Sequence, residues 1–222
     1  VMPCTAKKFE AKRPELSHNG LADVDVVITT RELARMIKEA GIDFPNLPDE
    51  DFDSLLGEST GASVIFGATG GVMEAALRTA YNMITGKELE QVDLTAVRGV
   101  EGVKEASVQV GDLTVNVAVA NGTANAAKLL AQVRSGEKQY HFIEVMGCPG
   151  GCVTGGGQPI VSAQKRMECD PRAVRAAALY REDANKPLRR SHENPEIKAL
   201  YADYLGAPNS HKAHELLHTT YT

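Results

Sequence analysis

The stretch between residues 113 and 146 limits the possible folds most strongly, because its apolar residues change their period twice. "LTVNVAVANG" alternates, with Val115, Val117 and Val119 on one side, which indicates a half-buried strand. "TANAAKLLAQVRSG" then follows a helical pattern as far as Gly136, and "YHFIEVM" returns to the pattern of a strand. A strand, a helix and a second strand in succession predict a parallel or mixed sheet that is covered by helices.

The flanking segments extend this α/β pattern. "DVDVVITT" at residues 23–30 predicts a short strand, and Thr30 is placed to cap a helix over "RELARMIKEAG". "SVIF" predicts an apolar strand that a glycine-rich turn at residues 67–71 joins to a further helix. After residue 160, "DPRAVRAAALYRED" and "NPEIKALYADYLG" both predict helices. We therefore expect an α/β lobe followed by C-terminal helices.

Two glycine-rich turns, at residues 67–71 and 147–157, each follow a predicted strand. In sheets of this kind, ligands bind near the carboxyl ends of the strands. We expect the two turns to lie at the same edge of the sheet and to form a site there.

Composition excludes several classes of partner. The 222 residues carry a net charge of -5, so no broad basic surface for nucleic acid is predicted. No apolar run approaches the roughly 20 residues that span a bilayer. Four cysteines are few for a secreted disulfide scaffold, and a chain of this length can bury a core without disulfides, so we expect a reducing compartment. Because the sequence starts "VMPCTAKKFE", without an initiator methionine, we also expect a piece of a longer chain.

Cys148 and Cys152 are separated by three residues in "CPGGC". Structural zinc sites usually use two such pairs, whereas Cys4 and Cys169 are isolated, so a zinc ribbon fits poorly. A disulfide within this loop would be small and strained. Cysteines beside proline and glycine are typical of iron–sulfur ligation, because glycine lets the backbone approach a cluster. The spacing alone leaves an iron–sulfur cluster and a structural turn as alternatives.

A second metal-like pattern, "HELLH", lies at residues 214–218 and matches the H-E-x-x-H of zinc peptidases. On a helix, His214 and His218 would share one face, with Glu215 as base and His211 one turn earlier. Four residues follow His218, so the sequence offers no downstream third ligand. A zinc peptidase is therefore the weaker interpretation of this segment.

"MPCTAKKFE" and "FIEVMGCPGGCVTGGGQP" resemble the second and third signature segments of the iron-only ([FeFe]) hydrogenases. The resemblance runs from residue 2 to residue 221 and includes "TTRELARMIKEAGI", "GASVIFGATGGVMEAALRTAY" and the "SHENPEI" and "SHKAHELLH" tail. It implies the C-terminal part of the catalytic domain of that family. Residues 1–20 would carry the second signature, residues 21–160 an α/β lobe that ends in the third, and residues 161–222 a helical C-terminal region.

The resemblance also implies the cofactor of that family, the H-cluster. This is a [4Fe–4S] cubane joined through a cysteine sulfur to a two-iron unit with carbon monoxide, cyanide and dithiolate ligands. Cys4, Cys148 and Cys152 would ligate the cubane, and Cys152 would also bridge to the two-iron unit. Cys169 has no counterpart in the family motifs and is expected to be a free thiol. Gly147 stands where many relatives have alanine, which removes a methyl group near the cluster.

Five further residues are assigned to the pocket of the two-iron unit by the same resemblance. Lys7 would donate a hydrogen bond to a cyanide, and Met2 and Met146 would pack thioethers around the irons; Lys7 and Met146 are the expected catalytic residues. Phe66 and Val72 would wall off the cluster, and amides of the glycine loop between them would face the other cyanide. Without the motifs, Lys7 would be interpreted as a solvated lysine and the apolar side chains as core.

The implied activity is the reversible oxidation of H2, with electrons leaving through iron–sulfur clusters. The first signature of the family, T-S-C-C-P, supplies the fourth cubane cysteine and the proton donor, and these 222 residues lack it. We therefore expect the missing N-terminal part, in the same or a separate chain, as one partner. A ferredoxin or a flavin-, NAD(P)- or formate-linked subunit would be the redox partner. The alternative is a non-catalytic hydrogen sensor or an iron–sulfur scaffold protein.

Overall fold

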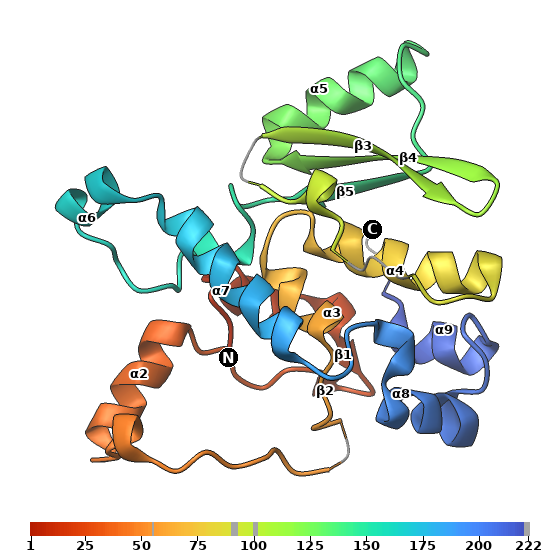
Figure 1. The fold of residues 1–222 in the computed structure, drawn as a ribbon. Helices are drawn as coiled ribbons and strands as arrows, with labels where there is room; N and C mark the ends of the chain where they lie inside the picture. Colours follow the sequence, from red (N-terminus) through yellow and green to blue (C-terminus); the bar gives the residue numbers. More distant parts are fainter. Residues whose placement is uncertain (55, 90–92, 100–101, 220–222) are drawn as a thin grey trace. The chain divides into compact units, whose positions relative to one another are not determined.

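A computed structural model describes residues 1–222 apart from residues 55, 90–92, 100–101 and 220–222, and the chain falls into two compact units (Figure 1). The first unit contains residues 1–58, 155–160 and 195–222, and the second contains residues 59–154 and 161–194. The chain therefore passes from the second unit into the first directly after the cysteine loop. In the described part of the chain, no helix combines the length and the apolarity needed to cross a membrane.

Short helices and two-residue strands make up the first unit. Helix α2 begins at a capping box, in which the side chain of Thr29 accepts from the amide of Glu32 and the Glu32 carboxylate accepts from the amide of Thr29. The elements of this unit are α1 Lys7–Glu10, β1 Ser17–His18, β2 Leu21–Ala22, α2 Thr30–Glu39, α8 Pro195–Leu200, the π-helical turn η7 Tyr201–Leu205 and α9 His211–Leu217.

A mixed sheet and the helices around it make up the second unit. Strand β3 pairs with β4 in antiparallel fashion and β4 pairs with β5 in parallel fashion, which gives the order β3-β4-β5. The predicted α/β class with a mixed sheet is therefore confirmed. The elements are α3 Gly61–Val64, α4 Gly71–Thr85, β3 Val103–Val110, β4 Leu113–Asn121, α5 Thr123–Arg134, β5 Phe142–Met146, α6 Ala163–Glu168 and α7 Pro171–Asn185.

Both faces of the sheet are covered, because the valines of β4 pack on α4 and its alanines pack on α5 (Figure 1). Small alanine side chains let α5 approach the strand closely, whereas the larger valines fill the space between the sheet and α4. The core on the α4 side contains Met73, Leu77, Val97, Val117 and Val119, and the core on the α5 side contains Ala118, Ala120, Ala126 and Leu129.

Two of the predicted strands are wrong. Residues 23–30 do not form a strand, and Thr29 pairs with Met2 in an isolated parallel bridge, because strand-forming residues still need a neighbouring strand to pair with. "SVIF" instead forms α3 and the 3-10 turn Ile65–Gly67, since the periodicity of a short apolar run does not separate a buried helix from a strand. The cap of α2 is Thr29 rather than Thr30.

The remaining elements follow the predictions closely. Strand β4, helix α5 and strand β5 match the predicted strand, helix and strand, and α7 begins at Pro171 after its N-cap Asp170. Strand β3 was not predicted. Every second residue of this strand, namely Lys104, Ala106 and Val108, faces the α4 side. Because the first of these inward positions holds a lysine, the sequence does not show the apolar alternation of a half-buried strand.

Candidate metal centre

The loop after β5 turns sharply between its two cysteines. The amide of Gly151 donates to the carbonyl of Cys148 at 2.9 Å, and Gly150 and Gly151 have φ angles of 87° and 96°. Residues with a Cβ rarely adopt such angles, so the turn requires both glycines of "CPGGC". The 3-10 turn Cys152–Thr154 follows at once. Cys148 and Cys152 are thereby presented from one short loop at the end of the strand that Met146 closes.

The glycine-rich loop before α4 lies directly against this cysteine loop. The amide of Thr69 donates to the carbonyl of Gly150 at 3.1 Å. A Cβ at Gly151 would lie 2.7 Å from both the carbonyl oxygen of Gly67 and the nitrogen of Thr69. The two glycine-rich turns therefore contact each other, but the prediction that both follow strands is wrong, because the first turn follows helix α3 and a 3-10 turn.

A buried carboxylate occupies the N-terminus of α4. Glu144 in β5 accepts from the amides of Gly70 and Met73, both at 2.7 Å, and is 6% exposed. A carboxylate is favourable there, because the first amides of a helix lack partners and the helix dipole is positive at this end. The prediction that the loop amides face a cyanide is therefore wrong for these two amides, whose hydrogens point to Glu144.

The first unit holds the segment of Cys4, residues 2–10, by backbone pairing. The amide of Met2 donates to the carbonyl of Ile28 at 2.9 Å, and the amide of Thr30 donates to the carbonyl of Met2 at 3.2 Å. From the other side, the amide of Gly157 donates to the carbonyl of Pro3 at 3.0 Å. The backbone that leads into the cysteine is thus fixed by two separate segments of the chain.

Two glycines of the "TGGGQP" run pack on the same segment. A Cβ at Gly157 would lie 2.8 Å from the Cβ of Thr29 and 3.0 Å from the backbone nitrogen of Cys4. A Cβ at Gly156 would lie 2.9 Å from the hydroxyl of Thr5. Glycine was expected because a cluster needs space next to the backbone. At these two positions, other residues of the same chain already fill that space.

Lys7 forms an ion pair with Glu10 in α1, and both side chains are more than a third exposed. Met2 and Lys7 share the wall of a cavity of about 270 Å³, together with Val1, Glu10, Ala11, Leu16, Val24, Val26 and Val27. The structure therefore brings the two residues assigned to the pocket from this unit to one place, where the Lys7 side chain is partly exposed to solvent.

The three pocket residues predicted in the second unit are accessible rather than packed in the core. Phe66 in the 3-10 turn is 45% exposed, and Val72 in the first turn of α4 and Met146 at the end of β5 are half-buried. The interpretation of these side chains as plain core is therefore wrong. A cavity of about 290 Å³ adjoins both glycine-containing loops and is lined by Ala68, Thr69, Arg98, Gly99, Gly150, Ala173, Ala176, Ala177 and Tyr180.

The cysteine sulfurs are available as ligands. The described residues include all four cysteines, and within that part of the chain no cysteine forms a disulfide; all four are half-buried. Close contacts of glycines shape the loops that carry Cys4, Cys148 and Cys152. Cys169, in contrast, is the C-cap of α6. The strained disulfide within "CPGGC" is therefore absent, and the choice between a turn and a metal ligand depends on what the chain is related to.

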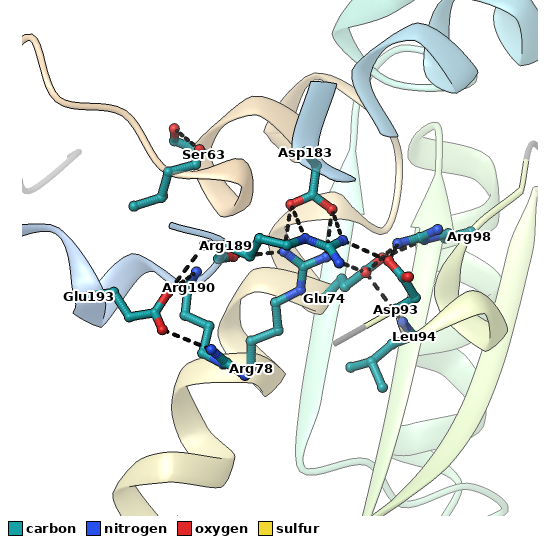
Figure 2. A network of polar contacts seen from close by, with 11 residues as sticks. Ser63, Glu74, Arg78, Asp93, Leu94, Arg98, Asp183, Arg189, Arg190 and Glu193 are labelled. Carbon is teal, nitrogen blue, oxygen red and sulfur yellow. Dashed lines mark hydrogen bonds and ion pairs between the residues drawn. The ribbon is translucent and has the colours of Figure 1, made fainter. Parts of the chain in front are cut away.

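A network of buried charges lies beside these loops in the second unit (Figure 2). Arg78 in α4 donates to both carboxylate oxygens of Asp183 in α7 at 2.9 Å and to Glu74 at 2.7 Å, and all three side chains are fully buried. Arg98 and Arg189 donate to the same carboxylates from the edge of the network, at 2.5 to 3.3 Å. The network ties α7 to α4 and so fixes one wall of the 290 Å³ cavity.

Two carboxyl groups in this network have a pKa below its ordinary value. Burial alone raises the pKa of Asp183, but the hydrogen bonds from Arg78 and Arg189 outweigh it and hold that pKa below its ordinary value. The Arg189 hydrogen bond likewise lowers the pKa of Asp93. Oxygens of Glu74, Asp93 and Asp183 come within 4.8 Å of one another, a spacing suited to a cation, but guanidinium groups already fill this role (Figure 2).

Only part of the "HELLH" segment lies on a helix. His214 and His218 have ring centroids 4.4 Å apart, and both side chains are exposed. Helix α9 ends at Leu217, so His218 lies outside it. Within the part of the chain that the structure describes, these histidines do not bring three ligand atoms together.

Family models decide between the alternatives. The model described as "Iron only hydrogenase large subunit, C-terminal domain" matches residues 1–156. The chain belongs to this family. A second model, "Iron hydrogenase small subunit", matches residues 169–222. The "HELLH" segment lies within the second match, so the iron-only hydrogenase family accounts for it as well.

Relatives in this family match the whole chain or most of it. The NADP-reducing hydrogenase subunit HndD of Solidesulfovibrio fructosivorans is 57% identical over 100% of this chain and 37% of its own length. Iron hydrogenase 1 of Clostridium pasteurianum is 52% identical over 100% of this chain and 38% of its own length. The periplasmic [Fe] hydrogenase large subunit of Nitratidesulfovibrio vulgaris is 58% identical over 72% of this chain and 38% of its own length. The chain thus spans less than two fifths of these relatives.

Solved structures of the family share the fold. The [FeFe]-hydrogenase HydA1 from Chlamydomonas reinhardtii is 43% identical with a TM-score of 0.77, over 99% of this chain and 61% of that chain. An [FeFe]-hydrogenase structure that concerns stepwise H-cluster assembly is 44% identical with the same TM-score and coverage.

Sequence reasoning missed the buried charges of this iron-only hydrogenase chain. Glu144 in "FIEVM" and Glu74 in "GGVMEAALR" interrupt apolar runs, and a charge in such a run is a signal that a buried partner exists. The partners of Glu144 lie 71 and 74 residues away along the chain, so local patterns do not identify them. The partners of Glu74 lie only 4 to 24 residues away, and the spacing of Glu74 and Arg78 by four residues is a local signal of this pair.

Proposed function

We propose that this chain forms part of the catalytic centre of an [FeFe] hydrogenase, which oxidises H2 and reduces protons reversibly. The proposal rests on the way the third signature is built. Cys148 and Cys152 lie on a glycine turn, and a few residues later Gly157 packs on the backbone nitrogen of Cys4. Glycines of the third signature therefore shape the backbone at Cys148 and Cys152 within the second unit and pack on Cys4 within the first unit.

The residues present fit an H-cluster. Thiolates are the ligands of iron–sulfur clusters, and Cys4, Cys148 and Cys152 are half-buried thiols without disulfides. We assign these three cysteines to the cubane and Cys152 also to the bridge toward the two-iron unit. When bound, the cofactor supplies the redox chemistry and the splitting of H2.

The remaining pocket residues shape the surroundings of the cofactor. Lys7 lies on the wall of a cavity beside Met2, and its ammonium would donate to a small anionic ligand of the cofactor. Met2, Met146, Phe66 and Val72 offer soft or apolar side chains that exclude water from the site. We assign Lys7 and Met146 as the catalytic residues that this chain contributes.

The fourth cubane cysteine and the proton donor belong to the first signature, which we assign to the N-terminal part of a longer polypeptide or a separate chain. The assignment is supported by the length of the relatives, because more than half of each relative lies outside the region that matches this chain. We propose a ferredoxin or a flavin-, NAD(P)- or formate-linked subunit as the redox partner. Because both family models match one continuous chain here, we propose the undivided, cytoplasmic form of the enzyme.

A second function is favoured by a more distant similarity. The cytosolic iron-sulfur assembly component 3 of Pongo abelii is 31% identical over 100% of this chain and 46% of its own length. As the alternative we therefore propose an iron–sulfur scaffold protein that keeps the cysteine segments without acting as a hydrogenase.

Infrared spectroscopy of the matured full-length polypeptide separates the two functions. A hydrogenase shows stretching bands of iron-bound carbon monoxide and cyanide, together with H2 uptake and evolution. Cys152→Ser should abolish these bands, and the matched control Cys169→Ser should keep them. A cubane without the bands would favour the assembly class, and bands that survive Cys152→Ser would contradict the bridging role.

A further inference from the structure

We infer that Lys104 and Glu144 act as a pair of positioning residues, which hold the glycine-rich loop at residues 67–71 against the cysteine loop. Their effect on the cofactor rests on the proposed function, whereas their hydrogen bonding to the loop does not depend on it. Neither residue belongs to the cysteines or to the pocket residues that the motifs assign.

The two residues lie in one row across the sheet. Lys104 in β3 pairs with Val119 in β4, and Val119 pairs with Glu144 in β5. Residues paired in this way share one face of the sheet. Val119 packs in the core on the α4 side, so the buried ammonium and the buried carboxylate both face the start of α4.

The pair binds the two sides of one peptide of the loop. The ammonium of Lys104 donates to the carbonyl of Thr69 at 3.0 Å and, outside the loop, to the carbonyl of Gly99 at 3.1 Å. The carboxylate of Glu144 accepts from the amide of Gly70 in the loop and from that of Met73 in α4. Because the peptide between Thr69 and Gly70 presents its carbonyl and its amide on opposite sides, one charge binds each side of the loop. A shift of the loop would break a hydrogen bond to a buried charge on both sides, which is costly.

The space around the loop leaves little freedom. A Cβ at Gly70 would lie 1.9 Å from the carbonyl oxygen of Val97 and 3.2 Å from the Lys104 ammonium. Gly70 has a φ angle of 89°, so glycine is required for conformation and for space. The loop is therefore held at its amides, at its carbonyls and by direct packing.

The position of the loop sets the position of the pocket residues in the second unit. Phe66 lies just before the loop, Val72 begins α4 just after it, and the Thr69 amide holds the Gly150 carbonyl of the cysteine turn. Glu144 itself lies two residues before Met146 in β5. The pair thus fixes the positions of both loops relative to the sheet.

The test uses full-length polypeptide in its cofactor-free and matured forms, with Lys104→Met and Glu144→Gln as the variants. Lys138→Met is the matched control, because Lys138 forms a half-exposed ion pair with Glu105 of the same sheet. Lys104→Arg is the conservative variant that keeps the charge and the donors.

In the cofactor-free form, amide hydrogen exchange of residues 67–74 should be on the order of tenfold faster in Lys104→Met and in Glu144→Gln than in the control. Lys104→Arg should recover most of the protection. In the matured form, the infrared bands of iron-bound carbon monoxide and cyanide should shift in the first two variants and stay in place in the control.

Unchanged exchange at residues 67–74 would overturn the inference. Equal loss of protection along β3 and β4 would also overturn it, since the pair would then only stabilise the sheet. If the wild type lacked the infrared bands, the proposed function would fail, and the exchange measurement would still decide whether the pair positions the loop.

Discussion

The two cysteine-bearing segments are held by different kinds of contact. In the second unit, the loop of Cys148 and Cys152 packs on the glycine-rich loop, which buried charges fix from both sides. In the first unit, the segment of Cys4 is held by backbone pairing, and its ion pair between Lys7 and Glu10 is more than a third exposed. Removal of a charge should therefore be costly in the second unit and cheap in the first, because a buried charge that loses its partner keeps its desolvation cost.

The largest expected effect is that of Asp183→Asn in the buried network. The change removes one carboxylate from Arg78 and from Arg189, which keep only Glu74 and Asp93, and should lower the free energy of unfolding by about 3–5 kcal/mol. Glu10→Gln, the control in the first unit, should cost about 0–1 kcal/mol, because its ion pair is exposed to solvent. Chemical denaturation of full-length protein measures both, and equal costs would remove the proposed difference between the two units.

Gly151→Ala should have the next largest effect. A Cβ there would clash with the glycine-rich loop in a backbone conformation that alanine avoids, which should cost about 1–3 kcal/mol and move the cysteine turn. Gly147→Ala is the matched control, because a Cβ at Gly147 meets no atom of the described chain within 4 Å. Its stability should stay within about 0.5 kcal/mol of wild type. Denaturation curves that rank the two variants in the opposite order would contradict the described packing of the loops.

Thr29→Ala should cost about 1 kcal/mol, because it removes the N-cap of α2 and its hydrogen bond to the Glu32 amide. Thr30→Ala should cost less, since Thr30 is the first residue within the helix. The comparison decides between the cap predicted from the sequence and the cap in the structure. Circular dichroism during thermal unfolding provides the measurement, and a larger loss for Thr30→Ala would favour the original prediction.

The smallest expected effect is a pH dependence in the first unit. The hydrogen bonds from the Thr29 backbone and from Lys8 lower the pKa of Glu32 from 4.5 to about 2. The unfolded chain therefore binds a proton at higher pH than the folded chain does, so the contribution of Glu32 is complete above pH 4.5 and is lost as the pH falls toward 2. The protection factors of the α2 amides, which are corrected for the intrinsic pH dependence of exchange, should fall over this range in wild type and depend less on pH in Glu32→Gln. An equal dependence in both proteins would contradict the role of Glu32.

Local patterns predicted the elements that carry their own signal. The alternation in β4, the helical period in α5 and the Asp170-Pro171 start of α7 are all decided by residues close together in the chain. The strands expected at residues 23–30 and in "SVIF" failed, because pairing with a neighbouring strand is a tertiary property. Strand β3 was missed for the related reason that Lys104 takes a core position.

The candidate site shows the same division. The motifs identified Cys4, Cys148 and Cys152, since their spacing is tied to one kind of cofactor. They did not identify Lys104 or Glu144, whose contacts with the loop span 35 and 74 residues of sequence. Close approaches such as that of Gly157 to Cys4 are visible only in the folded chain. They explain why glycine is needed at such positions, which the motif alone does not reveal.

The assignment of the cysteines is tested most directly by the Mössbauer spectrum and iron content of full-length polypeptide in which each cysteine of this chain is replaced singly by serine. Cys4→Ser, Cys148→Ser and Cys152→Ser should each lose or alter the cubane signal, because each removes one thiolate ligand. Cys169→Ser should leave the spectrum and the iron content unchanged. A wild-type spectrum in any of the first three variants, or a loss of iron in Cys169→Ser, would contradict the account.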